Sequence, residues 1–233
     1  MSRKITSAIV VIMAFLCMLS LSACNGNVQS DGIEILSQEE TSYMAESQGI
    51  CVMSACRMQP DEEALSSGQE DAAGIVVLNN SDKTLQYAEI TATFSDGTAY
   101  IYKLSTLPPG AECFVEEASL SPYRELTEGF SGFDINNIAF FTEEPSVHSD
   151  KLQFSGADGI LTVKNISDAD ITDDIVIYYK DYKDSQLASG KTYRVTVQGG
   201  LAKGEITQIM AGHYKLNGSM IMLVQLVSSG VSE

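Results

Sequence analysis

The fold of this chain is decided by residues 159–181, which read GILTVKNISDADITDDIVIYYKD. The segment opens with an apolar run, turns at Asn165, and continues in a stretch where Ile175, Ile177 and Tyr179 occupy every second position. A period of two is the pattern of a β-strand with one buried face, and Asn and Asp between two such runs favour a turn. The stretch therefore predicts two strands joined by a polar turn.

The first half of the chain contains a related pattern. A shift of 85 positions places Gly74-Ile75 on Gly159-Ile160 and Asn80 on Asn165. The same shift pairs two alternating sets, which are Ile90, Ala92 and Phe94 in the first half and Ile175, Ile177 and Tyr179 in the second. Further on, Leu107-Pro108-Pro109-Gly110 has its counterpart in Leu201-Ala202-Lys203-Gly204, after a longer hairpin. We therefore predict an internal duplication.

Strand and turn signals dominate the whole chain, and no segment has a long helical period. Each copy of the repeat provides about six or seven short strands, which is typical of an antiparallel β-sandwich. We expect an all-β fold with two tandem sandwiches, one over residues 33–145 and the other over residues 146–233. The apolar run at residues 220–224 is too short to span a membrane and is expected to be a core strand.

The N-terminus has the parts of an export signal. Arg3 and Lys4 precede an apolar stretch from residue 8 to residue 21, and small residues follow it. This stretch is shorter than the roughly 20 residues that a membrane-spanning helix needs, so a cleaved signal peptide over residues 1–23 is the preferred interpretation.

Leu21-Ser22-Ala23-Cys24 resembles the lipobox of bacterial lipoproteins. The resemblance implies cleavage between Ala23 and Cys24 and a diacylglyceryl lipid, with palmitate-type chains, on the Cys24 thiol. The protein would then be lipid-anchored at the bacterial cell membrane and face outside the cytoplasm, with the polar residues 24–32 as a flexible tether. The alternative is an ordinary secretory signal that is followed by a cysteine by chance.

A second resemblance concerns the fold. Residues 163–167, 175–181 and 201–205 are similar to a family of Ig-like domains of bacterial lipoproteins, the FxLYD-type domains. In that family an Asn-x-Ser turn precedes an alternating strand that ends in an aromatic residue and Asp. The first copy matches less well, since its strand ends in Phe94-Ser95-Asp96. The resemblance implies an Ig-like fold and a surface location, with no activity attached.

Charge narrows the classes of partner. Without residues 1–23 the chain has 12 basic and 31 acidic residues, a net charge of −19. A chain this acidic repels the phosphate backbone, so nucleic acid is not expected as a partner.

Two segments approximate catalytic motifs. Ser189-Gly190-Lys191-Thr192 resembles the end of a P-loop, but the first glycine of that motif is replaced by Ser185. The stretch at residues 129–133 approximates a nucleophile elbow whose second glycine comes one place early. The only histidines are His148 and His213, and neither has a catalytic context. We therefore expect no enzyme.

Metal binding has one weak candidate. Four carboxylates occur in a single turn and could provide the oxygen ligands of a calcium site, namely Asp168, Asp170, Asp173 and Asp174. The turn lacks the glycine and the distal glutamate of an EF-hand, so a solvated acidic turn is the simpler interpretation. Cys51 and Cys56 lack the further ligands of a zinc site. The only group expected on the chain is the covalent lipid of Cys24.

Three cysteines remain after the lipid site: Cys51, Cys56 and Cys113. An exported location permits a disulfide, and an odd number leaves one thiol over. In a regular strand Cys51 and Cys56 would point to opposite faces, which favours Cys113 as the partner of either. The alternative is three buried, reduced thiols.

Taken together, the sequence predicts a membrane-anchored, non-enzymatic interaction or scaffold module whose partner is a protein of the cell envelope. The alternative is a ligand-capturing lipoprotein that serves a transporter. A surface patch around Tyr178, Tyr179 and Tyr182 would favour a protein partner, and a deep polar pocket would favour a ligand.

Overall fold

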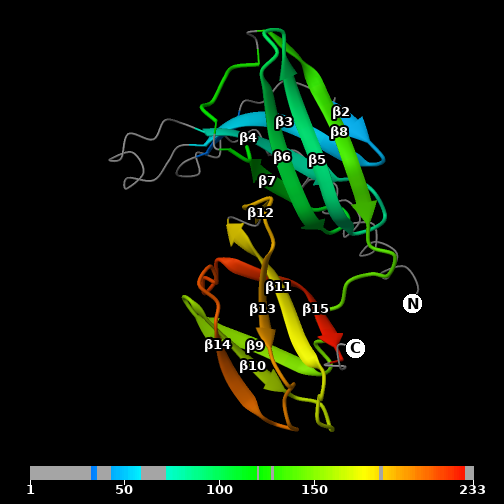
Figure 1. Ribbon diagram of the computed structural model, residues 1–233, viewed down its shortest axis with the longest axis vertical. Helices are drawn as coiled ribbons and strands as arrows, with labels where there is room; N and C mark the ends of the chain where they lie inside the picture. The colour runs from blue at the N-terminus through cyan, green and yellow to red at the C-terminus, as the bar shows by residue number, and fades with distance from the viewer. Residues whose placement is uncertain are drawn as a thin grey trace, which may run out of the picture. The chain divides into compact units, whose positions relative to one another are not determined.

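The computed structural model describes residues 33–35, 43–58, 72–119, 121–126, 129–183 and 186–228. All regular secondary structure among these residues is β-strand, so the prediction of an all-β fold is confirmed (Figure 1). One compact unit spans Gly32–Glu233. None of the described residues form a helix that is long and apolar enough to cross a membrane.

The first half of this unit contains two groups of hydrogen-bonded strands. One follows the order β3-β4-β7, with β1 and β2 both paired to β3, and the other follows the order β6-β5-β8. The bounds of these strands are β1 (Ile33–Ile35), β2 (Ala45–Ser47), β3 (Ile50–Met58), β4 (Ala72–Asn79), β5 (Leu85–Phe94), β6 (Ala99–Leu107), β7 (Glu112–Glu116) and β8 (Phe130–Phe140). Both groups contribute side chains to one hydrophobic cluster, as the two sheets of a β-sandwich do.

The second half repeats this arrangement. One group follows the order β14-β10-β9, and in the other β11 lies between β13 and β15. The bounds are β9 (Leu152–Ala157), β10 (Ile160–Asn165), β11 (Asp174–Lys183), β12 (Gln186–Leu187), β13 (Tyr193–Val197), β14 (Ile206–Met210) and β15 (Ser219–Val227). A second hydrophobic cluster takes side chains from both groups. Strands β9, β10 and β14 thus correspond to β3, β4 and β7, and β13, β11 and β15 correspond to β6, β5 and β8.

The predicted strand alternation decides which side chains enter the two cores. Ile90, Ala92 and Phe94 are buried in the first core, and their predicted counterparts Ile175, Ile177 and Tyr179 are buried in the second. The run at residues 220–224 lies in β15, and its Met222, Leu223 and Val224 are buried, as the sequence predicts. Burying side chains of this size stabilises each core by about 1.5–3 kcal/mol per residue.

The two halves are joined through one edge of β7. Strand β12 pairs with β7 in parallel, with Leu187 opposite Cys113, and this bridge makes nine strands into one sheet. Leu187 and Met222, both from the second half, are buried in the first hydrophobic cluster. The second half therefore completes the core of the first, and the predicted boundary between residues 145 and 146 stays a prediction.

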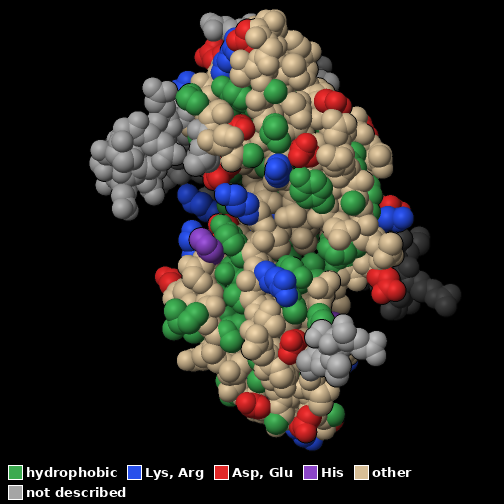
Figure 2. Space-filling view, viewed as in Figure 1, with side chains coloured by type: hydrophobic (Ala, Val, Ile, Leu, Met, Phe, Trp, Pro, Cys, Tyr) green, Lys and Arg blue, Asp and Glu red, His purple; other side chains and the backbone are tan. Residues whose placement is uncertain are grey.

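Acidic side chains are scattered over the face drawn in Figure 2, and they form no continuous patch there. This distribution is what an acidic chain needs for solubility, because mutual repulsion is lowest when like charges are spread.

Candidate functional site

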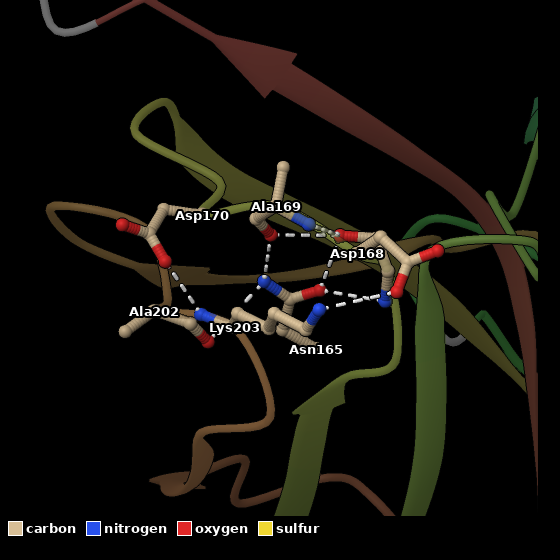
Figure 3. Close-up of polar contacts among 7 residues, drawn as sticks. Asn165, Asp168, Ala169, Asp170, Ala202 and Lys203 are labelled. Carbon is tan, nitrogen blue, oxygen red and sulfur yellow. Dashed lines mark hydrogen bonds and ion pairs between the residues drawn. The ribbon is translucent and has the colours of Figure 1, made fainter.

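Asn165 ends β10 and is fully buried, and its side-chain amide holds two turns together (Figure 3). Its Nδ2 donates to the carbonyl oxygens of Ala169 at 2.8 Å, Leu201 at 3.1 Å and Ala202 at 3.2 Å. Its Oδ1 accepts from the backbone N–H of Ser167 at 2.9 Å and from the Ser167 hydroxyl at 2.7 Å. We call this arrangement the Asn clamp, because one side chain satisfies both its own turn and the 201–204 turn.

The first half contains the same clamp around Asn79, which ends β4 and is also fully buried. Its Nδ2 donates to the carbonyl oxygens of Lys83 at 2.8 Å and Leu107 at 2.7 Å. Its Oδ1 accepts from the backbone N–H of Ser81 at 3.0 Å and from the Ser81 hydroxyl at 2.6 Å. The backbone bonds of the two clamps also match: the Gly110 N–H donates to the Asn79 carbonyl oxygen in the first half, and the Gly204 N–H donates to the Asn165 carbonyl oxygen in the second.

The clamps correct the predicted alignment of the two halves. The shift of 85 pairs Asn80 with Asn165, but Asn80 is exposed and it is Asn79 that makes the equivalent bonds. The true shift at this turn is therefore 86. The neighbouring asparagines at 79 and 80 look alike in the sequence, and only burial distinguishes them.

The acidic turn that the sequence offers for calcium organises the second clamp instead. An Oδ1 of Asp170 accepts the backbone N–H of Lys203 at 2.7 Å, and an Oδ1 of Asp168 lies 3.2 Å from the Lys203 ammonium. Asp174 bonds elsewhere, to the N–H of Gly199 at 2.7 Å. Across the described part of the chain, no three His, Cys, Asp or Glu side chains lie close enough to hold a metal ion. The carboxylates Asp168, Asp170, Asp173 and Asp174 therefore do not converge on one point.

The longer hairpin predicted for the second half is present, and it builds the contact between the halves. From the clamp asparagine to the clamped leucine carbonyl there are 28 positions in the first half and 36 in the second. The extra length contains β12 and residues 189–192. These four residues are the ones that resemble the end of a P-loop in sequence. This segment lies between β12 and β13 and packs against the first half.

Ser105 of β6 forms hydrogen bonds with this hairpin. Its backbone N–H donates to Gly190 O at 3.0 Å, and its hydroxyl lies 2.9 Å from the Thr192 hydroxyl. A Cβ on Gly190 would overlap the carbonyl oxygen of Lys103 and come within 2.7 Å of Val115 Cγ1. Only glycine allows the hairpin backbone to approach this closely.

Lys180 is fully buried beside the hairpin, and its ammonium crosses to the first half. The Nζ donates to Ser105 O at 2.7 Å and to Gly190 O at 3.1 Å. Burial lowers the pKa of Lys180 to about 8, although the nearby Cys113 and Asp181 act to raise it. Burying a cation is costly even when carbonyl oxygens accept its hydrogen bonds, so this lysine weakens the junction at neutral pH while it fixes the geometry of the junction.

The three predicted disulfide candidates, Cys51, Cys56 and Cys113, are all buried free thiols. A bulge between Val52 and Ser54 breaks the regular alternation of β3, so Cys51 and Cys56 share a face rather than pointing apart. They pair with Leu78 and Gly74, four residues apart on β4, which separates them by roughly 13 Å.

Cys113 lies two strands away from the other two cysteines, across β4, and belongs to the first core. No pair of these thiols is within disulfide reach, because bridged Cα atoms lie at most about 7 Å apart. Burial raises the pKa of Cys56 to about 12 and that of Cys113 to about 11, which makes both thiols unreactive.

The other candidate residues are also engaged in the fold. Residues 130–133 open strand β8, so Ser131 lies in a strand rather than on a sharp turn. His148 lies in a turn, and the exposed His213 stacks on Tyr193 with ring centroids 4.4 Å apart. The backbone N–H of His148 donates to the Ser146 hydroxyl at 3.0 Å, a bond that does not involve the imidazole.

The three tyrosines proposed as a surface patch are dispersed. Tyr179 is buried in the second core and Tyr182 packs against the first. Tyr178 points the other way and donates to the side-chain oxygen of Gln225 at 3.0 Å. Tyr178 and Tyr179 therefore face opposite sides of β11, and the three tyrosines do not form a common patch.

Sequence reasoning missed two buried charges. One is Lys180, and the other is Glu117, whose carboxylate accepts the N–H groups of Ser119 and Ser121, each at 2.8 Å. Burial alone would raise the pKa of Glu117, but these backbone bonds lower it below its ordinary value. The only sequence signal for Lys180 is its position directly after the alternating apolar run of β11, and Asp181 and Lys183 follow it in the same strand.

The predicted lipidation site, Cys24, and the predicted cleavage site after Ala23 lie outside the described residues. Comparison with protein-family models, with curated proteins and with solved structures finds no match for this chain.

Proposed function

We propose that this protein is a lipid-anchored bacterial lipoprotein that acts, without enzymatic activity, as an interaction or scaffold module at the outer face of the cell membrane. It would consist of two tandem Ig-like β-sandwich domains behind a cleaved signal peptide and a short tether. The anchor rests on the sequence, through the lipobox-like Leu21-Ser22-Ala23-Cys24. No cofactor is required beyond the lipid on Cys24.

The observation that carries the interaction role is the use of the polar residues. In both halves the conspicuous groups serve the turns and the junction: Asn79 and Asn165 the clamps, Asp170 the second clamp, and Lys180 the contact between the halves. Chemistry on a substrate needs polar groups that converge on a free site. What this chain offers to the outside is strand edges and sheet faces, which are surfaces for protein partners.

The anchor is tested by feeding cells an alkyne-labelled palmitate and isolating the full-length protein from membranes. We expect label on the wild-type chain and none on Cys24→Ser, which should leave the membrane fraction. Cys51→Ser is the matched control, since Cys51 is a buried thiol and the variant should keep its label. Labelling of Cys24→Ser would contradict the proposed anchor.

The interaction role is tested by photo-crosslinking in intact cells. A photoreactive residue replaces the exposed Gln86 in the first half or the exposed Gln198 in the second. A single dominant protein adduct supports the role. Protein adducts from neither position, together with a small molecule that co-purifies in stoichiometric amount, would favour ligand capture for a transporter instead.

A further inference from the structure

Strand β14 has an open edge and an apolar outer face. It ends the order β14-β10-β9, and no other described strand pairs with its free side. Ile206 is 59% exposed and Met210 is 80% exposed, on the same face of the strand as the exposed Gln208. The sequence of β14 is ITQIM, which contains none of the charges, prolines or bulges that protect sheet edges from pairing.

The first half shows what covers the equivalent edge. Strand β7 corresponds to β14, and the offset of 94 that relates Leu107 to Leu201 relates Glu112 to Ile206 and Phe114 to Gln208. The edge of β7 is occupied by β12, and Phe114 is 5% exposed. The same architecture thus pairs this edge with an added strand in one half and leaves it open in the other.

The hydrogen-bond phase of β14 fixes which backbone groups are free. Asn165 N–H donates to Glu205 O at 3.0 Å, and Ala211 N–H donates to Gly159 O at 2.9 Å. In an antiparallel ladder every second residue bonds to the same neighbour. The odd-numbered residues 205–211 therefore bond to β10, and the backbone groups of Ile206, Gln208 and Met210 point to the open edge.

We propose that β14 pairs antiparallel with β14 of a second copy of this chain, about a two-fold axis at Gln208. Ile206 would lie opposite Met210 of the second copy and Gln208 opposite its own counterpart. All three residues have outward backbone groups, so the phase matches and about six backbone hydrogen bonds form. The result is one continuous sheet across both copies, made by an isologous contact.

Self-pairing suits the charge of this chain. A chain with a net charge of −17 resists contact with its own copy unless the contact region is neutral. β14 has no charged residue, and the flanking Glu205 would lie opposite Ala211 of the second copy rather than opposite an acid. On the outer face, two apolar Ile–Met contacts would flank one Gln–Gln pair.

This proposal rests on the proposed interaction role and names a second copy as the partner. It is tested with Gln208→Cys in the full-length chain in membranes, oxidised with copper phenanthroline and separated on non-reducing gels. Directly opposed residues of a hydrogen-bonded pair lie about 5.5 Å apart, within disulfide reach, so we expect a disulfide dimer. The matched control is Gln153→Cys, exposed on β9 at the opposite edge of the same sheet, which should give roughly tenfold less dimer because no pairing brings two copies of it within reach.

A second variant keeps the test independent of chance collisions. Adding Ile206→Lys and Met210→Lys to Gln208→Cys puts four positive charges at the contact, and the dimer should fall to the level of the Gln153→Cys control. Circular dichroism checks that this variant is folded. Equal dimer from Gln208→Cys and Gln153→Cys, survival of the dimer with both lysines, or a dominant adduct of Gln208→Cys with a different protein would overturn self-pairing. The palmitate label on Cys24 and the crosslinks from Gln86 and Gln198 report on the proposed function separately.

Discussion

The two halves of this chain hold their turns with the same buried asparagine but differ in the length of one hairpin. Both close their sheets with a buried asparagine that bonds the carbonyl of the leucine in the Leu-x-x-Gly turn, Leu107 in one half and Leu201 in the other. They differ in the hairpin between clamp and turn, which is longer in the second half and docks on the first. The duplicated frame is thus fixed by buried polar turns, and the inserted hairpin turns two similar units into one connected structure.

The strongest test of the comparison is to remove each clamp in turn. Asn79→Ala and Asn165→Ala each remove at least four hydrogen bonds of a fully buried side-chain amide, and each lost bond costs about 0.5–1.5 kcal/mol. We expect each substitution to lower the free energy of unfolding by about 3–5 kcal/mol, by a similar amount in both halves. Urea titration of the mature chain, followed by circular dichroism and tyrosine fluorescence, measures both losses.

Asn136→Ala is the matched control for the clamps. Asn136 is exposed and bonds only to the nearby Asp134, so its loss should change the free energy of unfolding by less than about 0.5 kcal/mol. A loss below about 1 kcal/mol at either clamp would show that the two halves are not closed by the same interaction.

The junction is tested through the buried ammonium of Lys180. In the folded chain its pKa is about 8, below the ordinary value of 10.5, so between these pH values the unfolded chain binds more protons. Stability therefore rises with pH through this window, and the wild type should gain about 3 kcal/mol relative to Lys180→Met between pH 7 and pH 10.5. Urea titrations of both proteins at each pH give the difference.

Subtracting the variant removes the titration of tyrosines and cysteines that both proteins share. Lys191→Met changes an exposed lysine on the same hairpin, and it should show a much smaller pH-dependent difference from the wild type. If the difference between wild type and Lys180→Met is the same at both pH values, the ammonium of Lys180 is not buried in solution.

Period-two alternation was enough to predict the fold class and the inward residues of β5 and β11. The duplication and the longer second hairpin were also readable, because strand patterns and turn residues are local signals. The alignment was wrong by one position at the clamp, since Asn79 and Asn80 differ only in burial, which depends on the distant Leu107 carbonyl.

What stayed hidden depends on contacts across the chain. The bulge in β3 puts Cys51 and Cys56 on one face, and no residue type in that strand predicts a bulge. The bonds of Lys180 to Ser105 and Gly190 join residues 75 and 10 positions away, which no local pattern can encode. The open edge of β14 depends on which strands pair in space, since its counterpart β7 pairs with β12 and β14 has no such partner among the described strands.

The smallest expected effects concern the acidic turn, which is the feature of the second clamp that the first lacks. Lys203 and Asp168 form an exposed ion pair, with side-chain exposures of 59% and 106%, so Lys203→Ala should cost less than about 1 kcal/mol. Asp170→Ala should cost about 1 kcal/mol, because it removes the acceptor of the Lys203 N–H.

Since the carboxylates of the acidic turn do not converge, adding millimolar calcium should give the same melting temperature as adding EDTA. A saturable calcium-dependent rise that disappears in Asp170→Asn would instead show that the turn rearranges around a cation, and that the asymmetry between the two clamps is functional.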